Sequence, residues 1–352
     1  MRKFLCGIIL PIVFAVSCSH WKISELKGKK IFSLEQGSDN KQIALHFGNA
    51  DLLDMTFSIQ SSREHFFAVD NKLKRIQIFD AEGAFTGSIG AKKVDLLSLS
   101  SSFTFGTIGS VAMDSEGKVY VQNRIDLPNQ VKNDQAGDVD IASSYMLIFD
   151  KTGKLQYSLG QKGAADIPFN YIDKIFVDND DRLFVITKNY ETWGIYRFKS
   201  RVRDFFVTLG KDNFKDKDND QEYNGIIENI SPFRDGERFL ISVAYYSGTR
   251  FKYRKILEFS IRDNKVSRLI LQLPDPKNEL YTILDDKYLL LWDTDEKALR
   301  FAIWDLDGNI VNNLRLKTKS ISSYLTQIFT DESGRLFTYS VRKNGVDVME
   351  WK

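Results

Sequence analysis

One phrase of alternating apolar and polar residues occurs twice in the first half of this chain. Residues 76–90 read IQIFDAEGAFTGSIG, and residues 146–160 read MLIFDKTGKLQYSLG. Period-two alternation predicts strands that are buried on one side, and the Gly inside each phrase suits a tight turn between two such strands. A hairpin that recurs along a chain indicates a repeat architecture, in which each copy buries apolar surface against the next copy.

Six copies of a longer unit, with four short alternating runs each, cover most of the chain. They lie at 57–70 with 74–90, 111–123 with 145–160, 175–187 with 194–210, 230–244 with 254–271, 280–293 with 299–316, and 328–341 with 345–352. Turn pairs such as Glu116–Gly117, Asp307–Gly308 and Ser333–Gly334 supply residues that tolerate positive φ. Four-stranded antiparallel units of about 45 residues are typical of β-propeller blades. We therefore predict an all-β, six-bladed β-propeller of four-stranded antiparallel blades at 29–352.

The last copy predicts how the ring closes. It contains three strands, and its fourth, outermost strand is missing from the C-terminal sequence. The segment KKIFSLEQG, 29–37, has the alternation that this position needs. An N-terminal strand that completes the last blade would cover two sheet edges at once. The pattern FD..G......G within the copies also resembles the NHL repeats of six-bladed propellers, and this generic resemblance implies the fold without an activity.

The N-terminus has the layout of an export signal. Arg2 and Lys3 precede an apolar run, 4–16, which is shorter than the roughly 20 residues that span a bilayer as a helix. Small residues then lead into AVSC, which ends at Cys18. We expect a signal peptide at 1–17 and, at 18–28, a polar tether.

The AVSC ending resembles a bacterial lipobox, with Ala15 where Leu is commonest, and implies lipidation of Cys18. Lipidation would leave the mature chain without a free thiol, because the other cysteine, Cys6, lies in the signal. Under the sorting rule of Gram-negative lipoproteins, Ser19 favours the outer membrane of the cell envelope. The alternative is an ordinary signal peptide that releases a soluble periplasmic protein.

Charge excludes one class of partner. Without Arg2 and Lys3 the 49 basic residues become 47, which equals the 47 acidic residues. A balanced chain has no electrostatic footprint for nucleic acid, so we predict no nucleic-acid partner.

Residues suited to catalysis or to metal binding are sparse. Only three histidines occur, and we expect His65 to lie in a turn or at a strand edge. The segment DKDNDQE, 216–222, has aspartates at alternate positions but lacks the Gly and the final Glu of a calcium loop, so we interpret it as a solvated loop. Six-bladed lactonases hold calcium on their axis, and Asn123, Asn189 and Asp293 lie at strand ends that could face the axis here. We predict no cofactor and no catalytic residue.

The long insertions favour a binding surface. Segments 91–110, 123–143, 210–226 and 246–253 all fall between second and third strands or between blades, which is the same face of a propeller. Trp, Tyr and Arg are enriched at binding hot spots, and this face collects such residues. The candidate partner-binding residues are Arg124, Tyr190, Trp193, Tyr245, Tyr246, Arg250 and Trp292.

Together these patterns predict a membrane-anchored envelope lipoprotein that acts as a non-enzymatic binding or scaffold propeller for a protein or glycan. The alternative is a calcium-dependent hydrolase or lactonase with its site in the central funnel. The sequence leaves the oligomeric state open.

Overall fold

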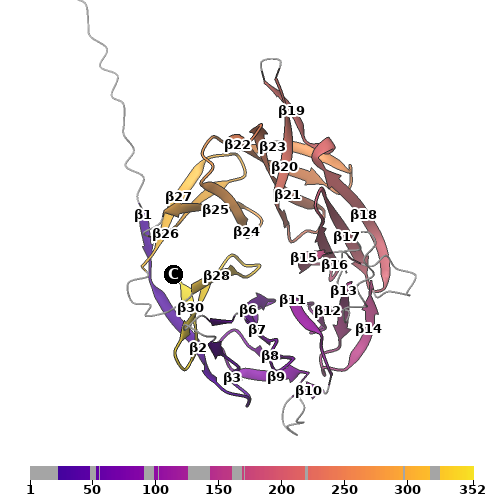
Figure 1. Cartoon of the computed structure of the whole chain (residues 1–352), viewed down its shortest axis with the longest axis vertical. Helices are drawn as coiled ribbons and strands as arrows, with labels where there is room; N and C mark the ends of the chain where they lie inside the picture. The colour runs from indigo at the N-terminus through magenta and orange to yellow at the C-terminus, as the bar shows by residue number, and fades with distance from the viewer. Residues whose placement is uncertain are drawn as a thin grey trace, which may run out of the picture.

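The computed structural model describes residues 23–47, 53–54, 56–90, 99–101, 103–125, 143–160, 169, 171–218, 221–295, 298–317 and 326–352. Six antiparallel sheets are arranged in a ring around a central axis (Figure 1). The predicted six-bladed propeller is therefore confirmed. The predicted signal peptide, 1–17, and Cys18 lie outside the described residues. In the described part of the chain, no helix has the length and hydropathy of a membrane span.

Each blade runs from an innermost to an outermost strand in chain order. Blade 1 contains β6 (Phe57–Ser62), β7 (His65–Asp70), β8 (Arg75–Phe79) and β9 (Phe85–Ile89). Blade 2 contains β11 (Thr107–Met113), β12 (Val119–Ile125), β13 (Ser143–Phe149) and β14 (Leu155–Leu159). Blade 3 contains β15 (Tyr171–Val177), β16 (Leu183–Lys188), β17 (Thr192–Lys199) and β18 (Val202–Gly210). Blade 4 contains β20 (Gln221–Pro232), β21 (Arg238–Ser247), β22 (Arg250–Ser260) and β23 (Lys265–Leu273). Blade 5 contains β24 (Asn278–Leu284), β25 (Tyr288–Asp295), β26 (Ala298–Asp305) and β27 (Ile310–Leu316).

Blade 6 is completed from the other end of the chain, as predicted. After β28 (Thr326–Thr330), β29 (Leu336–Arg342) and β30 (Gly345–Trp351), the outermost antiparallel strand is β2 (Gly28–Gln36). Leu34 of β2 lies opposite Val346 of β30, and both side chains are buried between blades 6 and 1. The N-terminal strand thereby closes the ring.

A further N-terminal strand differs from the prediction. Residues Ile23–Leu26, which we assigned to a tether, form β1 and pair in parallel with β27 at the outer edge of blade 5. Lys27 continues the strand, because its backbone exchanges hydrogen bonds with Lys352. One extended run from residue 23 to residue 36 therefore joins blade 5 to blade 6.

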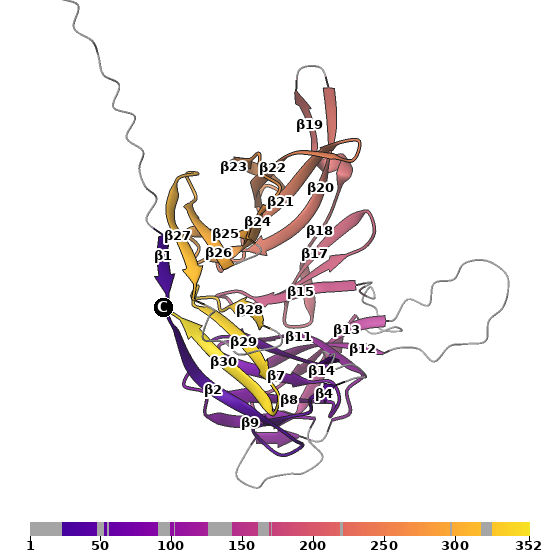
Figure 2. The same ribbon diagram turned by 60° about the vertical axis from the view of Figure 1, so that its left-hand side comes forward.

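Short extra strands add to other blades. The strands β3 (Gln42–Ile43) and β10 (Leu99–Ser101) lie parallel to β2 and β9, and β4 (His46–Phe47) pairs with β5 (Leu53–Asp54). A 3₁₀ turn, η1 (Lys211–Asn213), precedes β19 (Lys215–Asp218), which forms a ribbon with β20. This ribbon extends blade 4 beyond its neighbours (Figure 2).

The core consists of six apolar clusters, one between each pair of neighbouring blades. Strand β7 shows how the sequence produces this arrangement. Phe66 and Ala68 pack toward blade 6, whereas Phe67 and Val69 pack toward blade 2. Because both faces of a blade are buried, the middle strands are apolar at successive residues rather than at every second one.

Polar side chains link the blades close to the axis. The innermost strands of blades 2 to 5 carry β-bulges, which leave backbone groups without a partner in the ladder. Amide side chains satisfy several of them: Gln60 Nε2 donates to Gly109 O at 3.0 Å, and Asn229 Nδ2 donates to Leu280 O at 2.7 Å. The remaining neighbours are joined by Gln122 to Ile172, Lys174 to Asn229, Tyr281 to Ile328 and Ser61 to Thr330. Links of this kind hold all six blades in register around the axis.

Candidate functional site at the axial channel

The turns between first and second strands gather around one end of the axis, which we call the turn mouth. They lie at 63–64, 114–118, 178–182, 233–237, 285–287 and 331–335. The antiparallel order places the links between second and third strands, and between blades, at the opposite end, which we call the insertion face. Residues 91–98, 102, 126–142 and 219–220 of the predicted insertions lie outside the described residues.

Aspartates at the turn mouth brace the turns. Asp178 Oδ1 accepts hydrogen bonds from the N–H groups of Asp180 and Arg182, both at 2.9 Å. Asp114 repeats this pattern in blade 2 with the residues two and four positions later. The segment at 178–182 is therefore a hairpin turn, and Asp178 has a structural role in it.

Two of these turns use strained backbone. Arg63 and Glu64 have φ of 48° and 61°, and Asp285 and Asp286 have φ of 47° and 54°. Non-glycine residues in this region cost on the order of 1 kcal/mol or more each. Two consecutive residues with positive φ form a tight turn whose backbone twist matches the twist of the two flanking strands. Such strain often accompanies functional sites, and here both turns contribute side chains to the channel.

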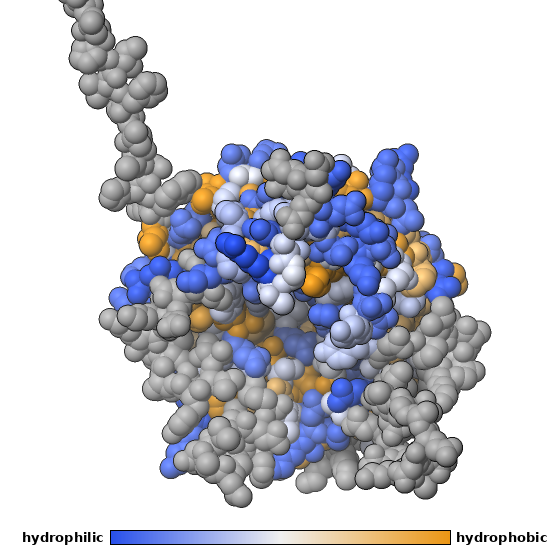
Figure 3. Space-filling view, turned by 45° about the horizontal axis from the view of Figure 1, so that its top comes forward, coloured by the Kyte–Doolittle hydropathy of each residue, from blue (hydrophilic) through white to orange (hydrophobic). Residues whose placement is uncertain are grey.

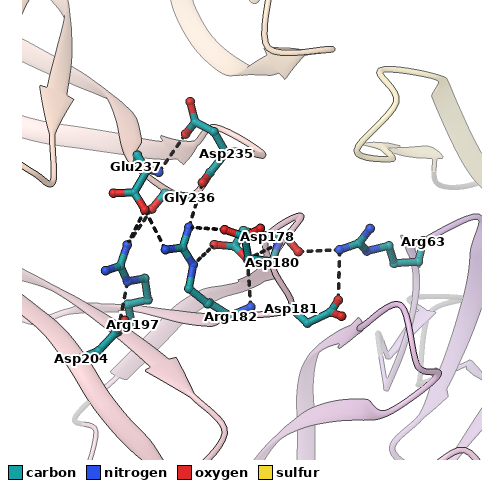
Figure 4. Close-up of polar contacts among 10 residues, drawn as sticks. All are labelled: Arg63, Asp178, Asp180, Asp181, Arg182, Arg197, Asp204, Asp235, Gly236 and Glu237. Carbon is teal, nitrogen blue, oxygen red and sulfur yellow. Dashed lines mark hydrogen bonds and ion pairs between the residues drawn. The ribbon is translucent and has the colours of Figure 1, made fainter.

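Arg63 crosses from blade 1 to blade 3 over the turn mouth. Its Nη2 donates to Asp178 O at 2.5 Å and lies 3.4 Å from Asp181 Oδ1 (Figure 4). Ser115 of blade 2 donates to the same aspartate through its backbone N–H and its hydroxyl, at 2.9 and 2.5 Å. Three blades therefore meet at Asp181.

An ion-pair network continues from this point to blade 4. Arg182 lies 2.6 Å from Asp178 Oδ2 and 2.7 Å from Glu237 Oε1, and Arg197 shares the second carboxylate at 3.0 Å (Figure 4). Burial alone would lower the pKa of Arg182, but hydrogen bonds to the two carboxylates raise it. Gly236 packs against this network with φ of 63°, and an added Cβ would lie 1.9 Å from Asp178 Oδ2.

Two cavities follow the axis inward from the turn mouth. The outer one, of about 300 Å³, includes Arg63, Glu64 and Ser115 in its lining, and the inner one, of about 240 Å³, includes Lys174 and Thr282. They share Arg234, Asp331 and Glu332, so they adjoin each other at these residues. A space-filling view shows the molecule hollowed near its centre, with hydrophilic residues in the hollow (Figure 3).

Lys174 is the cation deepest in this space. Its Nζ donates to Asn229 Oδ1 at 2.8 Å and lies 3.9 Å from Asp173. Burial lowers the pKa of Lys174, against the attraction of Asp173. The side chain is 32% exposed and lines the inner cavity, although its ammonium is desolvated.

On the insertion face, the predicted partner-binding residues of blades 2 and 3 differ in exposure. Tyr190 is fully exposed, at 100%. Trp193 is only 4% exposed and packs in the core between blades 3 and 4, with Lys188 Nζ 4.8 Å from its ring centre. Arg124 is half-buried within β12, opposite Ser144. The ring of Trp193 is therefore enclosed by the core and is not available at the surface in this structure.

In blade 4 the predicted loop at 246–253 is instead a long hairpin with a turn at 248–249. Successive residues of a strand point to opposite sides. Tyr245 accordingly faces the core between blades 3 and 4 and is 3% exposed. Tyr246 is half-buried on the opposite side of the hairpin, where its ring packs edge-on against Phe251 at 5.8 Å. Arg250 is exposed at the tip of the hairpin.

The last predicted residue, Trp292, is half-buried in blade 5. Its ring centre lies 6.0 Å from that of Tyr281 and 5.1 Å from that of Phe301. These contacts show a packing role for most of the indole. Of the seven predicted residues, Tyr190 and Arg250 are exposed, Arg124, Tyr246 and Trp292 are half-buried, and Trp193 and Tyr245 are buried.

The amide oxygens considered for an axial calcium already have partners. Asn123 Oδ1 accepts from Gly106 N–H at 2.9 Å, and its Nδ2 donates to Tyr145 Oη at 2.7 Å. Asn189 Oδ1 accepts from the backbone of Glu191 and Thr192 in a turn. The side chain of Asp293 lies outside the described residues. Among the described residues, no group of three or more His, Cys, Asp or Glu side chains is arranged to hold a metal ion.

The segment at 216–222 is partly a strand rather than a solvated loop. Asp216 lies in β19, where Tyr253 Oη donates to its carboxylate at 2.6 Å and Lys255 Nζ contacts the same oxygen. Burial would raise the pKa of Asp216, but these two hydrogen bonds lower it. His65, by contrast, begins β7 at a hairpin turn, as predicted.

Sequence reasoning missed the residues of the channel, namely Arg63, Lys174 and Arg234. The clearest available signal was that the turns at 63–64 and 285–286 lack the Gly or Asn that such turns normally use. Only the closed ring brings these side chains together.

No protein-family model matches the chain, and no curated protein matches it. Solved structures are similar in fold. A gluconolactonase from Xanthomonas campestris is 12% identical, with 92% of this chain and 99% of that chain covered, at a TM-score of 0.46. A luciferin-regenerating enzyme is 11% identical, with coverage of 92% and 95% and a TM-score of 0.42. A protein of unknown function from Bacteroides caccae is also 11% identical, with coverage of 76% and 85% and a TM-score of 0.42.

Proposed function

We propose that this protein is a lipid-anchored binding propeller of the bacterial cell envelope, which contacts a protein or glycan partner through the insertion face without catalysing a reaction. The observation that carries this proposal is the side of blade 4 that bears Tyr246, near the tip of the β21–β22 hairpin. Ile226 is 57% exposed there, beside the half-buried pair Tyr246 and Phe251, with Arg250 exposed at the tip. Aromatic and Arg side chains around an exposed aliphatic residue are typical of binding hot spots.

The alternative, a calcium-dependent hydrolase in the funnel, has less support in the described residues. Asn123 and Asn189 use their oxygens to hold backbone N–H groups. Using them as ligands would leave those N–H groups unsatisfied, at about 1–3 kcal/mol each.

The test is a quantitative co-purification from detergent-solubilised envelopes. It compares the native protein with the variant Tyr190→Ala/Tyr246→Ala/Arg250→Ala. A matched control, Tyr288→Ala/Arg262→Ala, removes one aromatic and one Arg near the turn mouth. We expect the native protein and the control to enrich the same partner, and the insertion-face variant to lose it. Equal recovery by all three would show that this face does not bind.

Lipidation of Cys18 is tested separately by Cys18→Ser. The structure shortens the expected tether, because the first described strand begins at Ile23, five residues after Cys18. Five extended residues span at most roughly 18 Å, so the propeller would lie close to the bilayer. The native protein should partition into detergent and Cys18→Ser should not. Equal partitioning of the two would refute the anchor.

A further inference from the structure

The inner cavity holds cationic groups with few partners. The guanidinium of Arg234 lines both cavities at their junction, and its nearest carboxylate in the described residues, Asp285, is 3.8 Å from Nη1. No hydrogen bond from this guanidinium to a described residue is present, although the group can donate five. Lys174 likewise donates one of its three N–H bonds, to Asn229.

The carboxylates that line the cavity have more hydrogen-bond partners within the protein than these two cations do. Glu332 accepts from Ser62 Oγ at 2.7 Å and from the backbone N–H of Arg63 at 3.0 Å. Asp286 accepts from the backbone N–H of Arg234 at 2.8 Å, and burial raises its pKa. These groups fix the turns of blades 1 and 4, so they leave the two cations as the main unsatisfied donors facing the space.

Hydroxyl side chains complete the lining. Ser61, Ser231, Thr282 and Thr330 surround the inner cavity, together with the apolar Ile175, Phe176 and Ile283. Such a mixture suits a ligand with polar edges and at least one apolar face. The inner cavity alone, at about 240 Å³, has the volume of roughly eight water molecules in the liquid, and with the outer cavity it enters the size range of small-molecule sites.

The walls of this space are preorganised. The side-chain links that join blades around the axis hold the inner strands, and Arg63 ties blade 1 to blade 3 at the entrance. A ligand entering such a site would find its donors already oriented, which reduces the entropy cost of binding.

We propose that the axial channel binds a small carboxylate that carries neighbouring hydroxyl groups, with its carboxylate between Lys174 and Arg234. A bidentate guanidinium contact and an ammonium suit a carboxylate, and the free lone pairs of Asp286 and Glu332 and the Ser and Thr hydroxyls suit hydroxyl groups. This site is separate from the partner-binding surface proposed for the insertion face.

The experiment is isothermal titration calorimetry of the full-length protein in detergent with three probes. D-Glucuronate carries both features, D-glucose carries only the hydroxyl groups, and acetate carries only the carboxylate. We expect D-glucuronate to bind at least about tenfold more tightly than either of the others, because each removes one set of charge-assisted or neutral hydrogen bonds. Failure of D-glucuronate to bind, or equal binding of acetate or of glucose, would overturn the proposal.

Variants locate the site. Arg234→Gln and Lys174→Gln should each weaken D-glucuronate binding by about tenfold or more. The exposed Arg262→Gln is the matched control and should bind as the native protein does. Arg234→Gln is the more informative variant. Its guanidinium makes one ion pair with a described residue, at 3.8 Å to the exposed Asp285, so its loss should leave the fold intact. Unchanged affinity in Arg234→Gln, with a native melting temperature, would place any bound glucuronate elsewhere and refute the site.

Discussion

Closure by β2 makes one quantitative prediction about stability. Leu34 is 0% exposed and lies in the cluster between blades 6 and 1. Leu34→Ala removes three carbon atoms, a transfer term of about 2.4 kcal/mol at about 0.8 kcal/mol for each, and the cavity adds a further penalty. We expect a loss of about 3–4 kcal/mol. With an unfolding entropy of about 2.1 cal/mol/K per residue, a propeller of this length should melt about 5 °C lower.

The assay is thermal and urea unfolding of the native protein, Leu34→Ala, a control variant and the variants of a double-mutant cycle. Ile23→Ala is the matched control, since this β1 side chain is 50% exposed and should change stability by less than about 0.5 kcal/mol. A double-mutant cycle with Val346→Ala tests the register, because Val346 lies directly opposite Leu34. Neighbouring residues of this kind should show a coupling energy above about 0.5 kcal/mol. A loss below about 1 kcal/mol for Leu34→Ala, with simple additivity in the cycle, would refute closure by β2.

Three further predictions concern the ion-pair network, the stability at acidic pH and the core. Gly236→Ala and Gly248→Ala impose similar backbone strain, because the two glycines have φ of 63° and 60°. Only at Gly236 would the added Cβ collide with a carboxylate, so Gly236→Ala should lower the free energy of unfolding by at least about 2 kcal/mol more than Gly248→Ala. Equal melting temperatures of the two variants would contradict this. Asp216 has a lowered pKa, so its contribution to stability is present above its ordinary value of 3.8 and disappears as pH falls through the lower folded value. Asp216→Asn should therefore lower the free energy of unfolding at pH 7, and that free energy should fall less steeply with acidification than in the native protein. Parallel curves of unfolding free energy against pH for the two proteins would contradict this role of Asp216. Trp193→Ala should cost about 3–5 kcal/mol and Tyr190→Ala less than about 0.5 kcal/mol, and the reverse order would place Trp193 at the surface.

The fold was predictable because its signals are local. Alternation in 76–90 and 146–160 and glycines such as Gly117 and Gly334 specify hairpins within a few residues of chain. The missing strand of the last blade then identified the closing segment. The short run ISEL at 23–26 carries too few apolar residues for the same reasoning, and its pairing with β27 depends on a strand about 290 positions away.

The functional residues were less predictable because composition does not state orientation. Tyr245 and Tyr246 are adjacent and chemically identical, yet Tyr245 faces the core between blades 3 and 4 and Tyr246 faces the opposite side of the hairpin. A residue's place in the hairpin register decides which. Arg63, Lys174 and Arg234 belong to three different blades, and only the curvature of the ring brings them to one channel. Neither property can be derived from spacing along the chain.

The continuous strand at 23–36 has a consequence for the order of folding. Its hydrogen-bond partners lie about 290 to more than 320 positions later, as in the pair Ser33 and Asp347, which are 314 residues apart. During synthesis this strand emerges long before those partners, and until then both it and the edge of β30 remain unpaired. Long-range pairing is slow, and open strand edges promote aggregation. The edges of β2 and β30 therefore stay exposed for as long as blade 6 is incomplete. Pairing of these two strands is the step that removes this route to aggregation.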